Sequence, residues 1–178
     1  MKYFLNNQTW SEITREERYF CAELFYEIRN NPIPFLSIIG RNNDIEYELG
    51  YEVCLYRDVS YSQKRSIKSS PFPQKRTFDL ALFSDEEIII IEAKANQGFD
   101  NQQLNDFKKD KELIMNLFQI DQKEHFEISL IALVSSRYRP SPATKEFFSN
   151  SFITWKKIAE IYPDRAEIFY RADSIYNR

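Results

Sequence analysis

The clearest pattern in the chain is a pair of apolar runs joined by a short acidic turn. The runs cover residues 78–83 and 88–91, and the acidic turn lies at residues 85–86. Two apolar stretches that flank a short polar turn are typical of a β-hairpin. If the turn is a two-residue loop, Ser84 faces Glu87, and the partner of every earlier residue follows by counting back.

Three charged residues lie at the open end of this predicted hairpin. The count places Asp79 opposite Glu92, and residues opposite each other in an antiparallel pair share a face, with Cβ atoms roughly 5 Å apart. Lys94 follows Glu92 by two residues, so it shares that face too. Two carboxylates beside an ammonium suit a hard divalent cation and a nucleophilic water. A register shifted by one residue would separate the carboxylates, leaving ordinary solvated charges at the end of a core strand.

The rest of the chain divides into segments of helical and strand periodicity, with a loop from Tyr61 to Arg76 before the hairpin. The sequence Asn30 to Pro34 ends the first helix. The apolar spacing predicts helices over residues 10–29, 100–118, 143–148, 154–162 and 164–178, and strands over residues 46–57 and 127–135.

The first predicted helix carries a glutamate within its apolar stripe. Thr14 and Glu17 have the spacing of a capping box. At about 100° per residue, Glu17 also falls near the centre of the stripe, and a buried carboxylate needs a cation or hydrogen-bond donors. Glu17 is therefore either a helix cap or part of the charged site. The stripe consists of Ile13, Phe20, Cys21, Leu24, Phe25 and Ile28.

Two segments are candidates for contact with phosphate groups. The loop from Tyr61 to Arg76 contains no acidic residue, and Arg137–Arg139 forms a second basic cluster around a tyrosine. Lysine and arginine on exposed segments are the usual phosphate contacts of nucleic-acid-binding proteins. The alternative is a solvated linker and ordinary surface. The predicted contact residues are Lys64, Arg65, Lys68, Lys75, Arg76, Arg137 and Arg139.

Composition excludes several classes of protein. The chain has 178 residues, 43% of them hydrophobic, and a net charge of -3, which fits one globular domain. Its three scattered glycines provide no phosphate-binding loop, and the single histidine, His125, lies near no nucleophile motif. No apolar stretch is long enough to span a membrane, and the N-terminus lacks a leader pattern. Cys21 and Cys54 lack metal-ligand spacing, so we expect free thiols in a reducing cytoplasm.

Residues Thr14 to Ser136 resemble the PD-(D/E)xK nuclease superfamily. Asp79 corresponds to the first acid of the motif, and Glu92-Ala93-Lys94 corresponds to its (D/E)xK element, while Phe78 replaces the proline. The resemblance implies an α/β fold with a restriction-endonuclease-like core, in which the order α-β-β-β-α-β builds a mixed central sheet flanked by helices. We expect a single domain over residues 1–178, with a helical C-terminal extension from about residue 140.

The resemblance also implies roles for individual residues. Asp79, Glu92 and the Ala93 carbonyl are expected to hold Mg²⁺, or Mn²⁺ in its place, with Glu17 from the first helix as a further ligand. Lys94 is expected to position the attacking water. Gln103 matches the glutamine of a Gln-x-x-x-Tyr pattern found in several branches, with phenylalanine in place of tyrosine at residue 107; it either orients the phosphate or is a polar residue at a helix edge.

The implied activity is hydrolysis of phosphodiester bonds, most simply in DNA, by an endonuclease that leaves 5′-phosphate ends. Restriction, mobile-element and defence enzymes are the expected settings, with nucleic acid as partner, no membrane, and a homodimer or larger complex as an option. A nuclease-like fold that only binds or scaffolds is the main alternative, and a chance motif in an unrelated α/β protein is the third.

Overall fold

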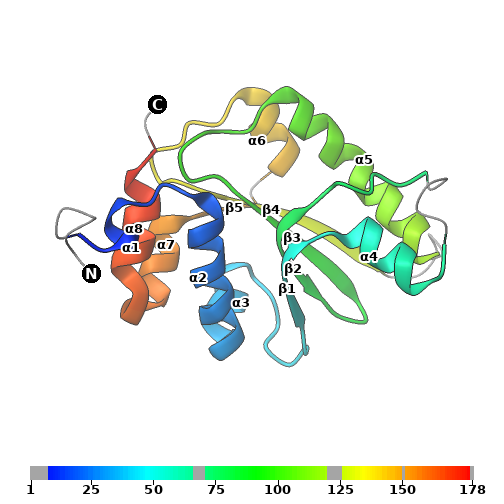
Figure 1. The fold of residues 1–178 in the computed structure, drawn as a ribbon, viewed down its shortest axis with the longest axis horizontal. Helices are drawn as coiled ribbons and strands as arrows, with labels where there is room; N and C mark the ends of the chain where they lie inside the picture. Colours follow the sequence, from blue (N-terminus) through cyan, green and yellow to red (C-terminus); the bar gives the residue numbers. More distant parts are fainter. Residues whose placement is uncertain (1–7, 66–70, 120–125, 150, 177–178) are drawn as a thin grey trace.

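The computed structural model describes residues 8–65, 71–119, 126–149 and 151–176. Within these residues, five strands form one mixed sheet in the order β1-β2-β3-β4-β5 (Figure 1). The first three are antiparallel neighbours, and the last three run parallel. The strands are β1 (Glu48–Val53), β2 (Phe78–Phe83), β3 (Glu87–Ala93), β4 (Glu127–Val134) and β5 (Phe152–Thr154).

Helices cover both faces of the sheet (Figure 1). One group packs on one face and consists of α2 (Glu17–Asn30), α3 (Ile33–Ile38), α7 (Trp155–Ile161) and α8 (Ala166–Ser174). The other group packs on the opposite face and consists of α4 (Leu55–Ser62), α5 (Asn101–Phe118) and α6 (Pro142–Phe148). The short helix α1 (Trp10–Ile13) contacts α8, and the 3₁₀ helix η2 (Pro163–Arg165) joins α7 to α8. The predicted α/β class, with a mixed sheet flanked by helices, is confirmed.

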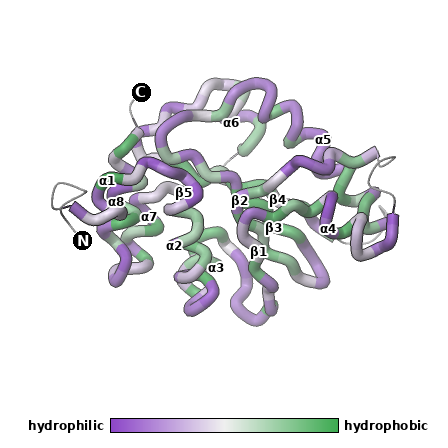
Figure 2. Tube along the Cα trace, in the orientation of Figure 1, coloured by the Kyte–Doolittle hydropathy of each residue, from purple (hydrophilic) through white to green (hydrophobic). Residues whose placement is uncertain are grey.

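The central strand β3 explains the long isoleucine run. Ile89 and Ile91 pack into the cluster beneath α2, α7 and α8, whereas Ile88 and Ile90 pack beneath α4 and α5. A strand covered on both faces is apolar at consecutive positions rather than at alternate ones. Hydrophobic segments accordingly follow the strands inside the molecule in Figure 2.

The strand predicted over residues 46–57 is wrong beyond Val53. Glu52 adopts a left-handed backbone with φ of 51°, and the chain then turns into α4. Leu55 and Tyr56 are the first two residues of α4, and both are buried. The Tyr56 hydroxyl donates to Asp110 Oδ1 at 2.6 Å. Asp110 lies on α5, 54 residues further along the chain, so the local alternation of apolar and polar residues could not indicate this contact.

The helix predicted over residues 10–29 is interrupted. Thr14 has an extended backbone, and Arg171 from α8 donates to its carbonyl at 3.4 Å. The capping box predicted for Thr14 and Glu17 is wrong, because Thr14 Oγ1 accepts a bond from the Glu16 N–H and Glu17 bonds elsewhere. Glu17 instead opens α2 as its first residue.

The C-terminal elements follow the prediction more closely. Thr154 caps α7 by accepting from the Lys157 N–H at 3.1 Å, and α8 lies within the segment predicted to be helical. These helices share one apolar cluster with α2 and β3, so the extension belongs to the main core. The prediction missed α3 and the three-residue strand β5. Within the described residues no helix is long and apolar enough to cross a membrane.

Candidate active site

The β2–β3 hairpin has the predicted register. Leu80 lies opposite Ile91 and Phe83 lies opposite Ile88, and the Ser84 N–H donates to the Glu87 carbonyl at 3.0 Å. The Ser84 hydroxyl also accepts from the backbone N–H groups of Glu86 and Glu87, at 3.2 and 3.1 Å. This side chain stabilises the turn, which explains how the loop forms without glycine.

The strands separate at the open end of the hairpin, where Asp79 lies. Regular pairing ends at Leu80 and Ile91, and one further step in the same register sets Asp79 against Glu92. The Ala93 N–H donates to Asp79 Oδ2 at 2.8 Å. Because the N–H and C=O of one residue point to the same neighbour in an antiparallel ladder, the Ala93 carbonyl is directed to the Asp79 side.

Glu92 and Lys94 are both nearly inaccessible to solvent, with exposed fractions of 6% and 4%. Lys94 Nζ lies 3.4 Å from Glu92 Oε1 and 5.4 Å from the centre of the Phe99 ring. A buried ammonium needs paired charges and is also attracted to an aromatic face. The end of β3 is therefore a buried ionic site.

Glu17 reaches the same site from α2. Its Oε2 accepts a hydrogen bond from the Ala95 N–H at 2.7 Å, and its Oε1 lies 3.5 Å from Lys94 Nζ. The carboxylate thus bridges the helix N-terminus, the lysine and the backbone after β3. The structure brings Glu17, Asp79, Glu92 and Lys94 together, as the sequence predicted.

Burial dominates the electrostatics of the carboxylates. It raises the pKa of Glu92 to about 8, with the negative charge of Asp79 adding to the effect and Lys94 opposing it. Burial also raises the pKa of Glu17 and of Asp79. For Lys94, burial acts to lower the pKa, but the three carboxylates outweigh it and the pKa is raised. Lys94 therefore stays protonated, and its single positive charge faces three carboxyl groups.

Within the part of the chain that the structure describes, one carboxylate oxygen of the cluster has no hydrogen-bond partner. Glu92 Oε2 is buried and accepts no hydrogen bond from the described residues. No group of three or more histidine, cysteine, aspartate or glutamate side chains in the described part of the chain has the arrangement of a metal site. The residues with oxygens available for a metal are Asp79, Glu92 and, through its carbonyl, Ala93.

The backbone of Lys94 is held on both sides. Its N–H donates to the Leu133 carbonyl on β4 at 2.7 Å, and its carbonyl accepts from Trp155 Nε1 at 3.2 Å. Trp155 is fully buried and comes from the C-terminal extension. Sequence reasoning did not identify this residue, and 61 positions separate it from Lys94.

Gln103 completes a capping box at the start of α5. Its backbone N–H donates to Asp100 Oδ1 at 2.8 Å, and its side-chain oxygen accepts from the Asp100 N–H at 3.3 Å. This bond engages the side-chain oxygen, and the predicted role of Gln103 at a phosphate stays a prediction.

The basic residues of the first segment differ in environment. Lys64 and Lys75 are exposed, and the Arg65 guanidinium lies 6.0 Å from the centre of the Phe72 ring. Arg76 is instead committed to a partly buried pair, because its Nε donates to Asp110 Oδ2 at 3.1 Å and its guanidinium lies 4.5 Å from the centre of the Phe107 ring. Arg76 therefore anchors the segment to α5. Lys68 lies outside the described residues.

The second basic cluster follows β4, at the same end of the sheet as Lys94. Arg137 and Arg139 are exposed. The preceding Ser136 donates from its backbone N–H and from its hydroxyl to the two carboxylate oxygens of Asp173, each at 2.6 Å. This buried aspartate of α8 holds the cluster beside the candidate site.

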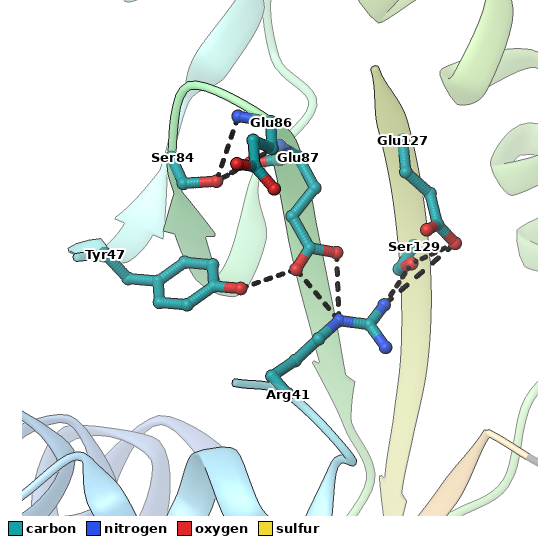
Figure 3. A network of polar contacts seen from close by, with 7 residues as sticks. All are labelled: Arg41, Tyr47, Ser84, Glu86, Glu87, Glu127 and Ser129. Carbon is teal, nitrogen blue, oxygen red and sulfur yellow. Dashed lines mark hydrogen bonds and ion pairs between the residues drawn. The ribbon is translucent and has the colours of Figure 1, made fainter. Parts of the chain in front are cut away.

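A second polar cluster lies at the opposite end of β3 and was not identified from the sequence. Arg41 Nε donates to both oxygens of Glu87 at 2.9 Å, and the Tyr47 hydroxyl donates to Glu87 Oε1 at 2.5 Å (Figure 3). Arg41 Nη2 also donates to Ser129 Oγ on β4 at 2.8 Å. Unlike Glu92, Glu87 has a bonded partner at each oxygen.

Comparison of the sequence with protein-family models and with curated proteins gives no match.

Proposed function

We propose that the chain is a divalent-metal-dependent endonuclease of the PD-(D/E)xK superfamily, with DNA as its substrate. The observation that carries this proposal is the convergence of Asp79, Glu92 and Lys94 at the open end of a buried hairpin, with Glu17 reaching them from α2. A scaffold needs no such concentration of buried charge, which is costly unless it is compensated.

The available oxygens fit a magnesium-type ion. Asp79 uses Oδ2 to accept the Ala93 N–H, and the buried Glu92 Oε2 has no hydrogen-bond partner among the described residues. Mg²⁺ is commonly held by one or two carboxylates, with water and substrate phosphate completing the coordination, so Asp79 and Glu92 would be enough protein carboxylates to hold it. Mg²⁺ or Mn²⁺, when bound, polarises a phosphate oxygen and lowers the pKa of a coordinated water.

Lys94 is placed to act on the attacking water and the phosphate. An ammonium has three N–H donors, and Glu17 and Glu92 lie near two of them, at 3.5 and 3.4 Å. In this proposal the third donor serves a water or a phosphate oxygen. Lys94 would orient that water and offset the negative charge that develops as the bond breaks.

Glu17 positions Lys94 in this proposal rather than binding the metal directly. One of its oxygens accepts the Ala95 N–H and the other faces Lys94 Nζ. It thereby sets the direction of the lysine and the path of the chain after β3.

Substrate contact is assigned to exposed basic residues, two in the first basic segment and two in the cluster that follows β4. The net charge of -3 gives the whole molecule no attraction for DNA. Local contacts from Lys64, Lys75, Arg137 and Arg139 would supply it, while Arg76 holds the first segment in place through Asp110.

The test is incubation of the full chain with supercoiled plasmid, single-stranded DNA and RNA, in Mg²⁺, Mn²⁺ or EDTA. Cleavage is expected with metal and not with EDTA. Lys94→Ala is expected to lower the rate by roughly a hundredfold or more, whereas Lys145→Ala, at an exposed lysine of α6, keeps the wild-type rate.

Two outcomes contradict the proposal. A folded wild-type protein that cuts no substrate in either metal is not a nuclease, and retained DNA binding would then favour the scaffold. A Lys94→Ala protein that cuts at the wild-type rate would show that the activity resides elsewhere.

A further inference from the structure

The N-terminal half of β4 forms an open edge of the sheet. β5 pairs with β4 only from Ala132 to Val134, although β4 begins at Glu127. In the part of the chain that the structure describes, residues 127–131 have a neighbouring strand on the β3 side alone. An unpaired strand edge is a template for another extended segment.

The hydrogen bonds of β4 show which groups face this edge. The Glu127 N–H donates to the Glu86 carbonyl, and the Leu133 carbonyl accepts from the Lys94 N–H, so odd-numbered residues bond toward β3. The Ala132 N–H donates to the Ser151 carbonyl on the other side. By the same alternation, the backbone N–H and C=O groups of Ile128 and Leu130 point to the open side.

Two cavities lie along this edge. One of about 410 Å³ is lined by Leu130 together with Phe107 and Phe147. The other, of about 250 Å³, is lined by Ile131 and Arg41 among others. Both are also lined by Glu127, Ser129 and Ser151. Since successive side chains of a strand point to opposite faces, a strand laid along this edge would direct its side chains alternately into the two cavities.

The charges around the larger cavity favour an acidic partner. Lys108 and Lys111 of α5 line it and are exposed. The neighbouring Asp110 is already bonded to Tyr56 and Arg76. On the other side of the edge, Arg41 is balanced by Glu87 (Figure 3). Glu127 also lines both cavities and lies 4.0 Å from Arg41. The cations Arg41, Lys108 and Lys111 therefore outnumber the carboxylates of Glu87 and Glu127, and the net charge beside the open edge is positive.

We propose that the open edge of β4 binds an extended peptide segment of another protein, which pairs with Ile128 and Leu130, inserts an apolar side chain into the larger cavity and presents a carboxylate to Lys108 and Lys111. Backbone bonds supply affinity in this mode of recognition, and the cavities on alternate faces supply specificity. The edge lies at the opposite end of the sheet from Lys94, so this surface does not depend on the nuclease assignment.

The probes are fluorescent nine-residue peptides in which valine or phenylalanine alternates with polar residues, made in an aspartate-containing and a lysine-containing series. Binding to the full chain is measured by fluorescence anisotropy. We expect members of the aspartate series to bind and the lysine series to fail. Lys108→Glu combined with Lys111→Glu should weaken binding roughly tenfold at low salt, with Lys145→Glu as the matched control.

Backbone pairing is tested with two sets of peptides that carry N-methyl groups on every second backbone nitrogen: one set is methylated at the odd positions and the other at the even positions. One of the two sets should lose binding, because its methyl groups replace the N–H hydrogens that face β4. The other set should still bind, because its methyl groups point away from β4. This comparison leaves the protein unaltered. Leu130→Pro, which removes an N–H on the open side only, should reproduce the loss.

Three results overturn the proposal. The first is that no member of the aspartate series binds. The second is that both sets of methylated peptides bind equally and Leu130→Pro has no effect, which indicates an anion-binding cavity without strand addition. The third is that the protein alone is a dimer that Leu130→Pro converts to a monomer, which assigns the edge to a second copy of the chain.

Discussion

Replacing Glu92 by glutamine should stabilise the protein when no metal is present. The side chain is 6% exposed, and burial raises its pKa to about 8 from an ordinary value of 4.5. Between these pH values the unfolded chain loses the proton and the folded chain keeps it. The unfolded state then binds fewer protons, so stability falls as pH rises through this range. Glutamine resembles the neutral carboxyl that the fold prefers.

The size of the effect follows from the two pKa values. The interval from 4.5 to about 8, at about 1.4 kcal/mol for each pH unit, gives an upper limit of about 5 kcal/mol above pH 8. The corresponding limit is roughly 3 kcal/mol at pH 7 and less than about 1 kcal/mol at pH 5. Glu92→Gln should therefore have little effect at pH 5 and a growing stabilising effect toward pH 8.

The assay is urea denaturation in EDTA at pH 5, 7 and 8.5, followed by tryptophan fluorescence. The matched control is Glu87→Gln, the same substitution at a buried residue of the same strand. Glu87 bonds Arg41 and Tyr47, so its replacement should cost about 1.5–3 kcal/mol. The two variants are expected to change stability in opposite directions at pH 7.

Two results would contradict this expectation: Glu92→Gln destabilises the protein at pH 8.5, or its difference in stability from the wild type is the same at pH 5 and pH 8.5. Either result would mean that the Glu92 carboxylate is compensated in the metal-free protein.

Three further predictions concern the candidate site. Millimolar Mg²⁺ or Mn²⁺ should raise the thermal midpoint of the wild type, because the ion binds the folded state alone, and should leave the thermal midpoint of Asp79→Asn unchanged. If a thermal scan shows equal shifts of the midpoint in both proteins, the ion binds elsewhere. Trp155→Phe keeps a six-membered aromatic ring but loses the pyrrole ring that donates to the Lys94 carbonyl. The lost bond and the space left at this buried position should together cost about 1–3 kcal/mol in urea denaturation and lower kcat with KM little changed. An unchanged kcat would limit Trp155 to a structural role. Lys75→Glu should weaken DNA binding and reduce its salt dependence by about one phosphate contact. Binding is measured by fluorescence anisotropy, with Lys145→Glu as the control. Equal effects of the two substitutions would show that the first basic segment makes no specific contact with DNA.

The charged site was predictable because its parts are related by local periodicity. Hairpin pairing is a count of adjacent residues, so the turn determines that Asp79 and Glu92 face one another once the register holds. The position of Glu17 in the apolar stripe of its helix indicated in the same way that its carboxylate points inward. These inferences needed no knowledge of how the helices pack.

The errors came from segments whose conformation depends on distant partners. Alternating apolar residues through Tyr56 suit a strand, but Tyr56 bonds Asp110 on α5 and the chain is helical there. Thr14 suits a helix cap, but α2 begins only at Glu17, while Thr14 Oγ1 accepts from the Glu16 N–H and Arg171 of α8 binds the Thr14 carbonyl. In both places a tertiary contact outweighs the local preference, which is worth only a fraction of a kcal/mol per residue.

The sequence was therefore sufficient for the α/β class, the hairpin and the residues gathered at its open end, since each is set by spacing along a short stretch of chain. Packing was needed to show that Trp155 holds Lys94 across 61 residues, that Arg76 is bound to Asp110 across 34, and that Arg41 neutralises Glu87 across 46. Contacts between distant segments leave no periodic trace in the sequence, because they depend on how the helices lie across the sheet. The open edge of β4 is of the same kind, since it exists only because β5 pairs with the last three residues of that strand.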